Sequence, residues 1–255
     1  MSVLANRLVL VTGAAGAVGA ATVRAVVSAG GQVIATDIDE ERLCSVVATE
    51  ARRIRLDVRD EAGWADIANT ITSGPTNLYG LVTCAAVMDI HDGDLSRMSA
   101  AAWQDTLAVN AQGAIAASRV AIELMANSGG GSIVHVSSIV GTRGSSTAQL
   151  AYTASKGAVS AITRELAVTY ASAGIRVNSV AAGLLDTPLT ASLVARPPEL
   201  LRRVTHIPLG RLGRPDEVAS ACVWLLSDAS SYVTAAELNV DGGLSSAFVT
   251  GRESV

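Results

Sequence analysis

The sequence predicts an α/β fold, a doubly wound parallel sheet of about seven strands with helices on both faces. Short runs of β-forming residues alternate with helix-like stretches along the whole chain, which is the pattern of successive β–α–β units. The 255 residues suffice for one domain with a sizeable core, and no repeat or low-complexity linker divides them. We therefore expect one domain over residues 1–255, with strands at 8–12, 32–37, 53–57, 80–85, 132–137, 176–181 and 237–241.

The first strand leads into a glycine-rich turn. Residues 8–11 read Leu-Val-Leu-Val, which suits a strand buried on both faces, and residues 12–19 read Thr-Gly-Ala-Ala-Gly-Ala-Val-Gly. A helix of small and apolar residues is expected over 20–29. A strand, a glycine-rich turn and a helix together aim free backbone N–H groups at a diphosphate, and the glycines let the backbone approach it.

The second strand, 32–37, ends in an acid, Asp37. An acid at this place accepts hydrogen bonds from an adenosine ribose and repels a 2′-phosphate, so it favours NAD over NADP. The uncharged Ala14 and Ala15 favour the same cofactor, and no basic residue directly follows Asp37. A solvated turn acid is the alternative interpretation.

Other residues with useful chemistry also follow predicted strands. Ligands of doubly wound sheets bind at the carboxyl ends of the strands, near the point where the strand order reverses. The sequence predicts one binding site at that edge, because five such residues lie at or just past a strand end: Gly13, Asp37, Asp57, Ala85 and Ser138.

Residues 152–156 read Tyr-Thr-Ala-Ser-Lys and contain a candidate pair for proton transfer. Side chains four residues apart lie on the same face of a helix, so Tyr152 and Lys156 can point into one site. A free tyrosine titrates at about 10, and a nearby cation favours the phenolate and lowers that pKa. The pair therefore suits proton exchange with a substrate hydroxyl, although an ordinary surface pair would show the same spacing.

Together these motifs resemble those of the short-chain dehydrogenase/reductase family, which has a single-domain Rossmann fold. The cofactor turn of the family, Thr-Gly-x-x-x-Gly/Ala-x-Gly, matches residues 12–19, and its four catalytic residues match Asn110, Ser138, Tyr152 and Lys156. The segments 177–180 and 186–188 resemble those that hold the nicotinamide. Cofactor contacts are thereby implied for Gly13, Ala15, Gly16, Ala17, Val18, Gly19, Asp37, Ile38, Asp57, Val58, Ala85, Ala86, Asn110, Tyr152, Lys156, Gly183, Leu185 and Thr187.

The resemblance also implies a mechanism, hydride transfer between nicotinamide and a carbonyl or secondary alcohol. Tyr152 would take up the hydroxyl proton, and Lys156 would lower the pKa of Tyr152 and bind the nicotinamide ribose. Ser138 would donate a hydrogen bond to the substrate oxygen. Asn110 would hold a water that passes the proton onward, and Thr187 would fix the carboxamide. A strand-end serine and a helix-bend asparagine are the structural alternatives for Ser138 and Asn110, and both can coexist with catalysis.

The chain departs from the family pattern in a few places. The usual Asn-Asn-Ala-Gly after the fourth strand is Thr-Cys-Ala-Ala at 83–86, which puts the backbone around Cys84 in question. The usual Pro-Gly is Ala-Gly at 182–183, and the third turn glycine is Ala17. Ser138 and Tyr152 are one residue further apart than is common, which predicts a bulged loop. No catalytic group is lost.

Composition argues against other classes of protein. The net charge of -4 and the lack of a basic block disfavour nucleic acid as a partner. The three cysteines, at 44, 84 and 222, are far apart and predict buried free thiols in a reducing cytoplasm. Neither they nor the three histidines have the spacing of a metal site, so no metal is expected. The uncharged run 124–142 is rich in glycine and serine, which favours a loop before a strand over a membrane span.

The substrate is expected to be a small to medium, neutral, apolar secondary alcohol or ketone, such as a cyclic or aryl-substituted one. Segment 184–207 is a candidate flap over it, in which the arginines at 196, 202 and 203 could meet an anionic substrate or form a solvated helical face. The expected pocket residues are mostly apolar: Ile139, Val140, Gln149, Ala182, Leu184, Leu185, Leu189 and Leu193.

Two other functions remain open. One is a 3-oxoacyl-thioester reductase acting on acyl-carrier-protein or CoA substrates, against which Asp37 counts because such enzymes usually prefer NADP. The other is a catalytically idle, cofactor-sensing or scaffold protein on the same fold, against which the four intact catalytic residues count. The family resemblance further implies a homotetramer, and the tail 244–255 could pack on a neighbour or fray.

Overall fold

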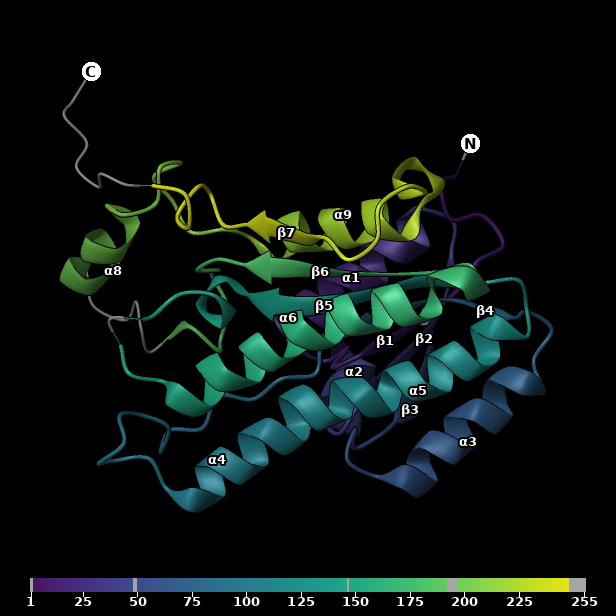
Figure 1. Cartoon of the computed structure of the whole chain (residues 1–255), viewed down its shortest axis with the longest axis horizontal. Helices are drawn as coiled ribbons and strands as arrows, with labels where there is room; N and C mark the ends of the chain where they lie inside the picture. Colours follow the sequence, from purple (N-terminus) through teal and green to yellow (C-terminus); the bar gives the residue numbers. More distant parts are fainter. Residues whose placement is uncertain (1, 48–49, 146, 192–196, 248–255) are drawn as a thin grey trace.

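The computed structural model describes residues 2–47, 50–145, 147–191 and 197–247. A seven-stranded sheet runs through the molecule with the order β3-β2-β1-β4-β5-β6-β7, and neighbouring strands pair in parallel (Figure 1). This topology confirms the predicted fold class. The strands are β1 (Leu8–Thr12), β2 (Gln32–Asp37), β3 (Arg52–Arg55), β4 (Leu78–Thr83), β5 (Gly131–Ser138), β6 (Ile175–Ala182) and β7 (Glu237–Val240).

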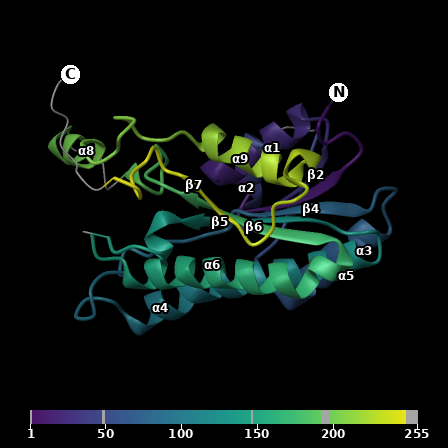
Figure 2. The same cartoon turned by 45° about the horizontal axis from the view of Figure 1, so that its top comes forward.

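Helices cover both faces of the sheet, as Figure 2 shows. One layer contains α1 (Ala17–Ser28), α2 (Glu40–Val46) and α9 (Pro215–Leu226). The opposite layer contains α3 (Glu61–Thr72), α4 (Ala100–Leu107), α5 (Gly113–Ala126) and α6 (Leu150–Tyr170). Helix α8 (Pro197–Val204) lies beyond the sheet, and short turns form η1 (Ala108–Gln112), η2 (Ile139–Gly141), η3 (Ala171–Ala173) and η4 (Asp228–Ser230).

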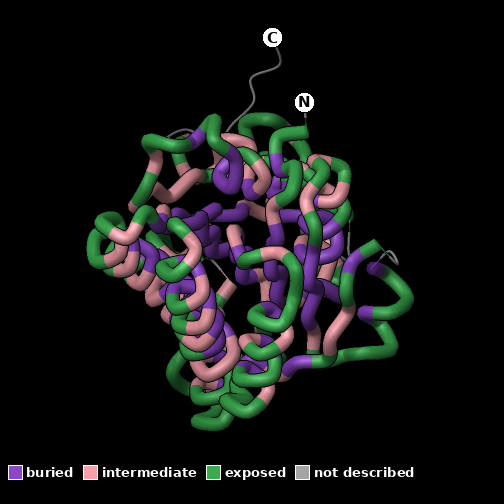
Figure 3. The backbone as a smooth tube through the Cα atoms, turned by 90° about the vertical axis from the view of Figure 1, so that its right-hand side faces the viewer, coloured by how far each residue is buried: buried purple, intermediate pink, exposed green. Residues whose placement is uncertain are grey.

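Each face of the sheet has its own apolar core, and both are drawn as buried in Figure 3. Successive side chains of a strand point to opposite faces, so β1 contributes Val9 and Val11 to the α1–α9 side and Leu8 and Leu10 to the α3–α5 side. The Leu-Val-Leu-Val run is therefore apolar throughout because neither face of β1 meets water.

Several predicted boundaries were wrong by one to three residues. Strand β3 ends at Arg55 and β4 at Thr83, so Asp57 and Ala85 lie two residues past their strands. Helix α1 begins at Ala17, three residues before the predicted start. The sequence predicts Gly19 as part of the turn, but it lies in the first helical turn, where a Cβ would collide with the carbonyl oxygen of Gly13.

The strand order reverses at β1, which has β2 on one side and β4 on the other. Chain connections leave β1 and β4 toward opposite layers, and this opens a crevice at their carboxyl ends. Residues 124–142 contain the end of α5, a turn, β5 and η2, so the predicted loop is shorter than expected and starts after a helix. Among the described residues, no helix combines the length and apolar character needed to cross a membrane.

Candidate active site

The glycine turn after β1 is a backbone cradle. Gly13 has a φ of 63°, and a Cβ there would lie 2.5 Å from the amide nitrogen of Ala85, so the turn and the segment after β4 touch through their backbones. Gly16 caps α1 without a side-chain hydrogen bond. The first N–H groups of α1 therefore have no side-chain acceptor, and they can bind an anion such as a diphosphate. These features fit a dinucleotide.

Asp37, the last residue of β2, faces this turn. Its Oδ2 accepts a hydrogen bond from the Ala15 N–H at 2.9 Å, and its Oδ1 accepts one from the Asp39 N–H at 3.1 Å. The two bonds fix the carboxylate between the turn and the start of the next loop. It stays half-buried, with capacity to accept further hydrogen bonds from a ligand.

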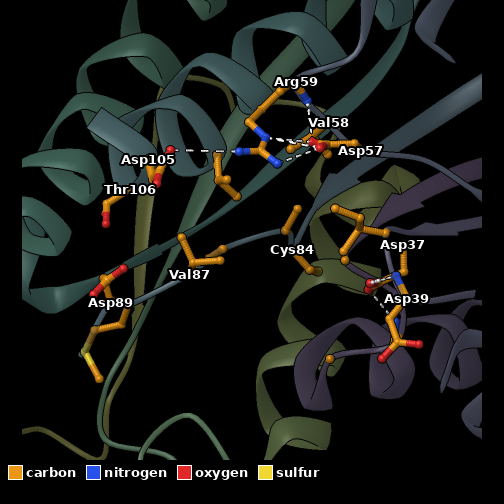
Figure 4. A pocket seen from close by; sticks show the side chains of 18 of the residues that line it. Asp37, Asp39, Asp57, Val58, Arg59, Cys84, Val87, Asp89, Asp105 and Thr106 are labelled. Carbon is orange, nitrogen blue, oxygen red and sulfur yellow. Dashed lines mark hydrogen bonds and ion pairs between the residues drawn. The ribbon is translucent and has the colours of Figure 1, made fainter. Parts of the chain in front are cut away.

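A cavity of about 750 Å³ lies beside the turn (Figure 4). Its volume falls in the range of cofactor sites, about 300–1,000 Å³. Half of the predicted cofactor contacts line it: Gly13, Ala15, Gly16, Asp37, Ile38, Asp57, Val58, Ala85 and Ala86.

The cavity also has charged walls that the sequence analysis missed. Arg59 forms an ion pair with Asp57, with Nη2 and Oδ2 2.7 Å apart, and its Nη1 lies 3.9 Å from Asp105 (Figure 4). Hydrogen bonds from Arg59 hold the pKa of Asp57 below its usual value, although burial opposes them. Arg42 and Asp89 line the same cavity. The sequence signal that could have predicted Arg59 in this cavity is its position directly after Asp57 and Val58, which were both predicted to contact the cofactor.

Asn110 lies in the π-helical turn η1 between α4 and α5, and its side chain is buried. Its Oδ1 accepts from the Val87 N–H at 2.8 Å, and its Nδ2 donates to the Val87 carbonyl at 2.9 Å and to Ser155 Oγ at 2.9 Å. Inserted π turns are frequent at functional sites. The bonds support the structural role that the sequence had left open, since Asn110 ties the segment after β4 to α6.

Ser138, Tyr152 and Lys156 meet at the carboxyl end of β5. Ser138 is the last residue of β5, and the other two lie one turn apart on α6. Lys156 is 4% exposed, its Nζ donates to the Val136 carbonyl at 2.9 Å, and the same Nζ is 5.6 Å from the centroid of the Tyr152 ring. The helix thus brings both side chains to one place, as the four-residue spacing predicts.

The electrostatics differ from the expectation in one respect. The sequence predicts that Lys156 lowers the pKa of Tyr152, but burial raises this pKa to about 12. A hydrogen bond with Ser138 opposes the rise. The physical reason is desolvation of the Tyr152 hydroxyl by burial, whereas the Lys156 ammonium donates to the Val136 carbonyl. Burial also lowers the pKa of Lys156 to about 8, so its ammonium titrates close to neutral pH but stays mostly protonated there.

The cysteines correct another expectation, that all three are buried. Cys44 is exposed, Cys84 is partly buried and Cys222 is fully buried, and all three are free. Cys84 and Cys222 belong to one apolar cluster, although they are far apart in the sequence. Burial raises the pKa of Cys84 to about 12, so this cavity-lining thiol is protonated at neutral pH.

The nicotinamide-side residues lie outside the 750 Å³ cavity. A Cβ on Gly183 would be 2.6 Å from Asp241 Cα, Leu185 is buried, and Thr187 shares a hydrogen bond with Thr190 through their hydroxyls at 3.0 Å. The cavity lining also lacks several other predicted contacts: Ala17, Val18, Gly19, Asn110, Tyr152 and Lys156.

Two of the expected substrate-pocket residues line other cavities formed by described residues. Gln149 lines a second cavity of about 550 Å³, and Leu185 lines a third of about 460 Å³. Leu189 is exposed, whereas Leu193 and the arginine at 196 lie outside the described residues. In the segment predicted to form a flap, Arg203 Nη2 donates to Thr147 Oγ1 at 2.8 Å, so α8 contacts the loop before α6.

A buried row of polar side chains lies beneath α6, and the sequence analysis did not find it. The strand register aligns Thr83, His135, Ser179 and Glu237 across the sheet from β4 to β7. Thr83 Oγ1 and His135 Nδ1 are 2.9 Å apart, Ser179 Oγ donates to Glu237 Oε2 at 3.3 Å, and Ser160 of α6 donates to the same oxygen. Burial lowers the pKa of His135 to about 4, so the ring is neutral at physiological pH.

Comparisons with known proteins agree with this geometry. A family model described as Enoyl-(Acyl carrier protein) reductase matches residues 13–245. The cis-4-hydroxycyclohexanecarboxylate dehydrogenase of Sinomonas cyclohexanicum is 38% identical over 244 residues, covering 94% of this chain and 96% of that protein. A 3-oxoacyl-(acyl-carrier-protein) reductase of Thermotoga maritima is 36% identical over 250 residues, covering 94% and 98%. The structure of Levodione Reductase superposes with a TM-score of 0.88 at 28% identity, covering 96% and 100%.

The doubly wound sheet and the dinucleotide-sized crevice beside a Ser–Tyr–Lys cluster define the class as nucleotide-dependent oxidoreductases. The chain belongs to the short-chain dehydrogenase/reductase family. Members of this family use NAD or NADP and act on hydroxyl or carbonyl groups, so the chain is an NAD(P)-dependent oxidoreductase.

Proposed function

We propose that the protein transfers a hydride between NAD and a secondary alcohol or ketone that is small to medium in size, neutral and apolar. The observation that carries the proposal is the cluster of Ser138, Tyr152 and Lys156 at the same sheet edge as the glycine cradle. An acid–base group and a dinucleotide cradle at one edge are what such a reaction requires.

The proton would move at the Tyr152 hydroxyl. Its pKa of about 12 keeps the phenol protonated at rest, so it is ready to donate to a carbonyl oxygen that is being reduced. In the oxidising direction it must accept the proton, and Ser138, which already opposes the rise in its pKa, would bind the same substrate oxygen. The nicotinamide, when bound, would supply the hydride acceptor or donor.

Lys156 and Asn110 would support this step. The Lys156 ammonium donates to the Val136 carbonyl and has further N–H groups free to bind the nicotinamide ribose. Because the pKa of Lys156 is about 8, close to neutral pH, its side chain can both hold and release a proton. Asn110 fixes the Val87 backbone beside α6, and its proposed part in leading a proton to solvent would use the remaining acceptor capacity of its Oδ1.

The preference for NAD rests on Asp37. Its carboxylate is fixed at the cavity wall by two backbone N–H groups, so it cannot turn away from a 2′-phosphate without losing them. Arg42 lines the same cavity and is the cation that could favour NADP instead, but it is exposed and therefore screened.

The substrate class is supported by the apolar residues near the catalytic cluster and by a relative. Ala182 and Leu185 are buried beside the end of β6, and the 38%-identical relative is named for a hydroxycyclohexane substrate. A cyclic secondary alcohol is the first candidate. The second candidate is a 3-oxoacyl thioester, which the name of the Thermotoga maritima relative favours and Asp37 disfavours.

The test is absorbance of the reduced nicotinamide with purified protein, NAD or NADP, and two substrate panels, cyclic secondary alcohols and 3-hydroxyacyl thioesters. Turnover of a cyclic alcohol with NAD that is lost in Tyr152→Phe supports the proposal. Turnover of thioesters with NADP favours the second candidate. Binding of NAD without turnover of either panel would favour a cofactor sensor, and absence of both binding and turnover would refute the proposal.

We further propose a single domain with a substrate flap at 184–207, a homotetrameric assembly and a cytoplasmic location. Exposed apolar side chains support the assembly, since Val168 on α6 is 77% exposed and Trp224 on α9 is 41% exposed. Light scattering coupled to size-exclusion chromatography tests the assembly, and a monomer would contradict it.

A further inference from the structure

Asp92 provides the only side-chain hydrogen bonds to the start of the catalytic helix among the described residues. Its Oδ1 accepts from the Ala151 N–H and its Oδ2 from the Tyr152 N–H, each at 2.9 Å. The adjacent Gly93 carbonyl accepts from the Leu150 N–H at 3.2 Å. The residue before the helix, Gln149, makes no side-chain cap, so a segment almost sixty positions earlier satisfies the first three N–H groups of α6.

The loop that carries Asp92 also forms part of the cofactor cavity. Val87, five residues before Asp92, is held by the Asn110 carboxamide through both its N–H and its carbonyl. The residues between these two anchors, 88–91, line the 750 Å³ cavity. The loop is therefore fixed to the catalytic elements at both ends, and its middle would face a bound dinucleotide.

We propose that Asp92 is a positioning residue for Tyr152, which sets the place of the Tyr152 hydroxyl relative to the cofactor cavity. The inference rests on the proposed function. A carboxylate bound to the Tyr152 N–H fixes the backbone of that residue directly, and its negative charge stabilises the positive end of α6. Small displacements of a reacting group, of about 1 Å, can lower a rate by about 100-fold.

The chain offers a matched control for an ordinary capping effect. Asp60 caps α3, where its Oδ1 accepts from the Ala62 N–H at 3.0 Å, and α3 carries none of the proposed catalytic residues. Asp92→Ala and Asp60→Ala each remove a carboxylate from a helix N-terminus. We expect both variants to lower Tm by about 2–4 °C. Only the first should disturb Tyr152.

The experiment compares kcat, the dissociation constant of NAD and the single-turnover rate of hydride transfer in these variants. Asp92→Ala should lower kcat and the single-turnover rate by about 10- to 100-fold and leave NAD binding within about twofold. Asp92→Asn retains one acceptor oxygen and should lose less. Asp60→Ala should stay within about twofold of the unchanged protein in all three quantities. Equal losses in the two alanine variants, or an unchanged rate in Asp92→Ala, would overturn the proposal.

A second readout does not depend on turnover. Amide hydrogen exchange of Ala151 and Tyr152 should accelerate in Asp92→Ala and remain unchanged in Asp60→Ala, whereas Ala62 should behave in the opposite way. If the unchanged protein turned over no alcohol, the proposed function would fail. The exchange pattern would still decide whether Asp92 holds Tyr152, and unchanged protection at both amides would refute it.

Discussion

The two sides of the crevice are built from different parts of the chain. At the end of β1, the candidate binding groups are backbone atoms held together by small residues such as Gly13, Gly16 and Gly19, and the Asp37 carboxylate at the end of β2 is itself held by two backbone N–H groups. At the end of β5, the proposed catalytic groups are the side chains of Ser138, Tyr152 and Lys156, which meet where this strand packs against α6. The difference teaches that the first side depends on local backbone geometry and the second on burial and on distant partners.

The largest expected effect comes from a substitution in the side-chain cluster at the end of β5, which leaves the glycine turn after β1 unchanged. Tyr152→Phe removes the hydroxyl that is proposed to move the proton, so turnover should fall by about 10²- to 10⁴-fold. NAD binding should be kept because the backbone cradle is untouched, and isothermal titration calorimetry measures it. Tyr232→Phe, on a fully exposed tyrosine, is the control and should change neither quantity. Residual turnover close to that of the control would remove Tyr152 from the mechanism.

The second prediction concerns the stability of the protein in acid, which depends on His135 of β5. The pKa of His135 is about 6.5 in the unfolded chain and about 4 in the folded protein. The contribution of neutral His135 to the free energy of unfolding is therefore fully present above pH 6.5 and is lost as the pH falls toward 4. The loss is about 3 kcal/mol at most. Urea unfolding at several pH values should show it. His135→Asn should flatten the dependence, and His91→Asn, at an exposed histidine, should leave it as it is.

The third prediction concerns a substitution in the glycine turn after β1. Gly13→Ala places a Cβ 2.5 Å from the Ala85 amide nitrogen at a positive φ, so we expect a loss of about 1–3 kcal/mol in the free energy of unfolding. NAD binding should weaken as well, because the turn must move. Gly144→Ala is the matched control, since a Cβ there meets nothing within 4 Å. Calorimetric Tm and NAD affinity check both effects, and equal behaviour of the two variants would contradict the cradle.

The smallest expected effect tests whether Asp37, at the end of β2, selects NAD over NADP. Asp37→Ser removes the carboxylate charge that is proposed to repel a 2′-phosphate, and with it the acceptor of the Ala15 N–H. The ratio of kcat/KM for NADP to that for NAD should rise about tenfold. Asp39→Ser alters a neighbouring acid that lines the same cavity and should change the ratio much less. A ratio that responds equally in both variants would show that general charge, rather than Asp37, selects the cofactor.

Sequence reasoning was strongest where spacing alone sets geometry. The alternation of strands and helices gave the correct class of fold, and the four-residue spacing placed Tyr152 and Lys156 together on α6. It was weaker at strand and helix ends, as with Gly19, because a glycine is compatible with either a turn or a tightly packed helix. It missed Arg59, whose place in the cavity depends on the ion pair with Asp57.

The sequence by itself determined the fold class, the glycine cradle and the family, because backbone preferences and short-range spacing are written in neighbouring residues. Only the tertiary structure decided the electrostatics of the cluster. It removed Tyr152 and His135 from water, so that burial moved the pKa values of both away from their usual values, and it directed the Lys156 ammonium to the Val136 carbonyl. It also brought Asp92 to the first turn of α6. Burial and contacts between distant segments set these properties, and no local pattern encodes them.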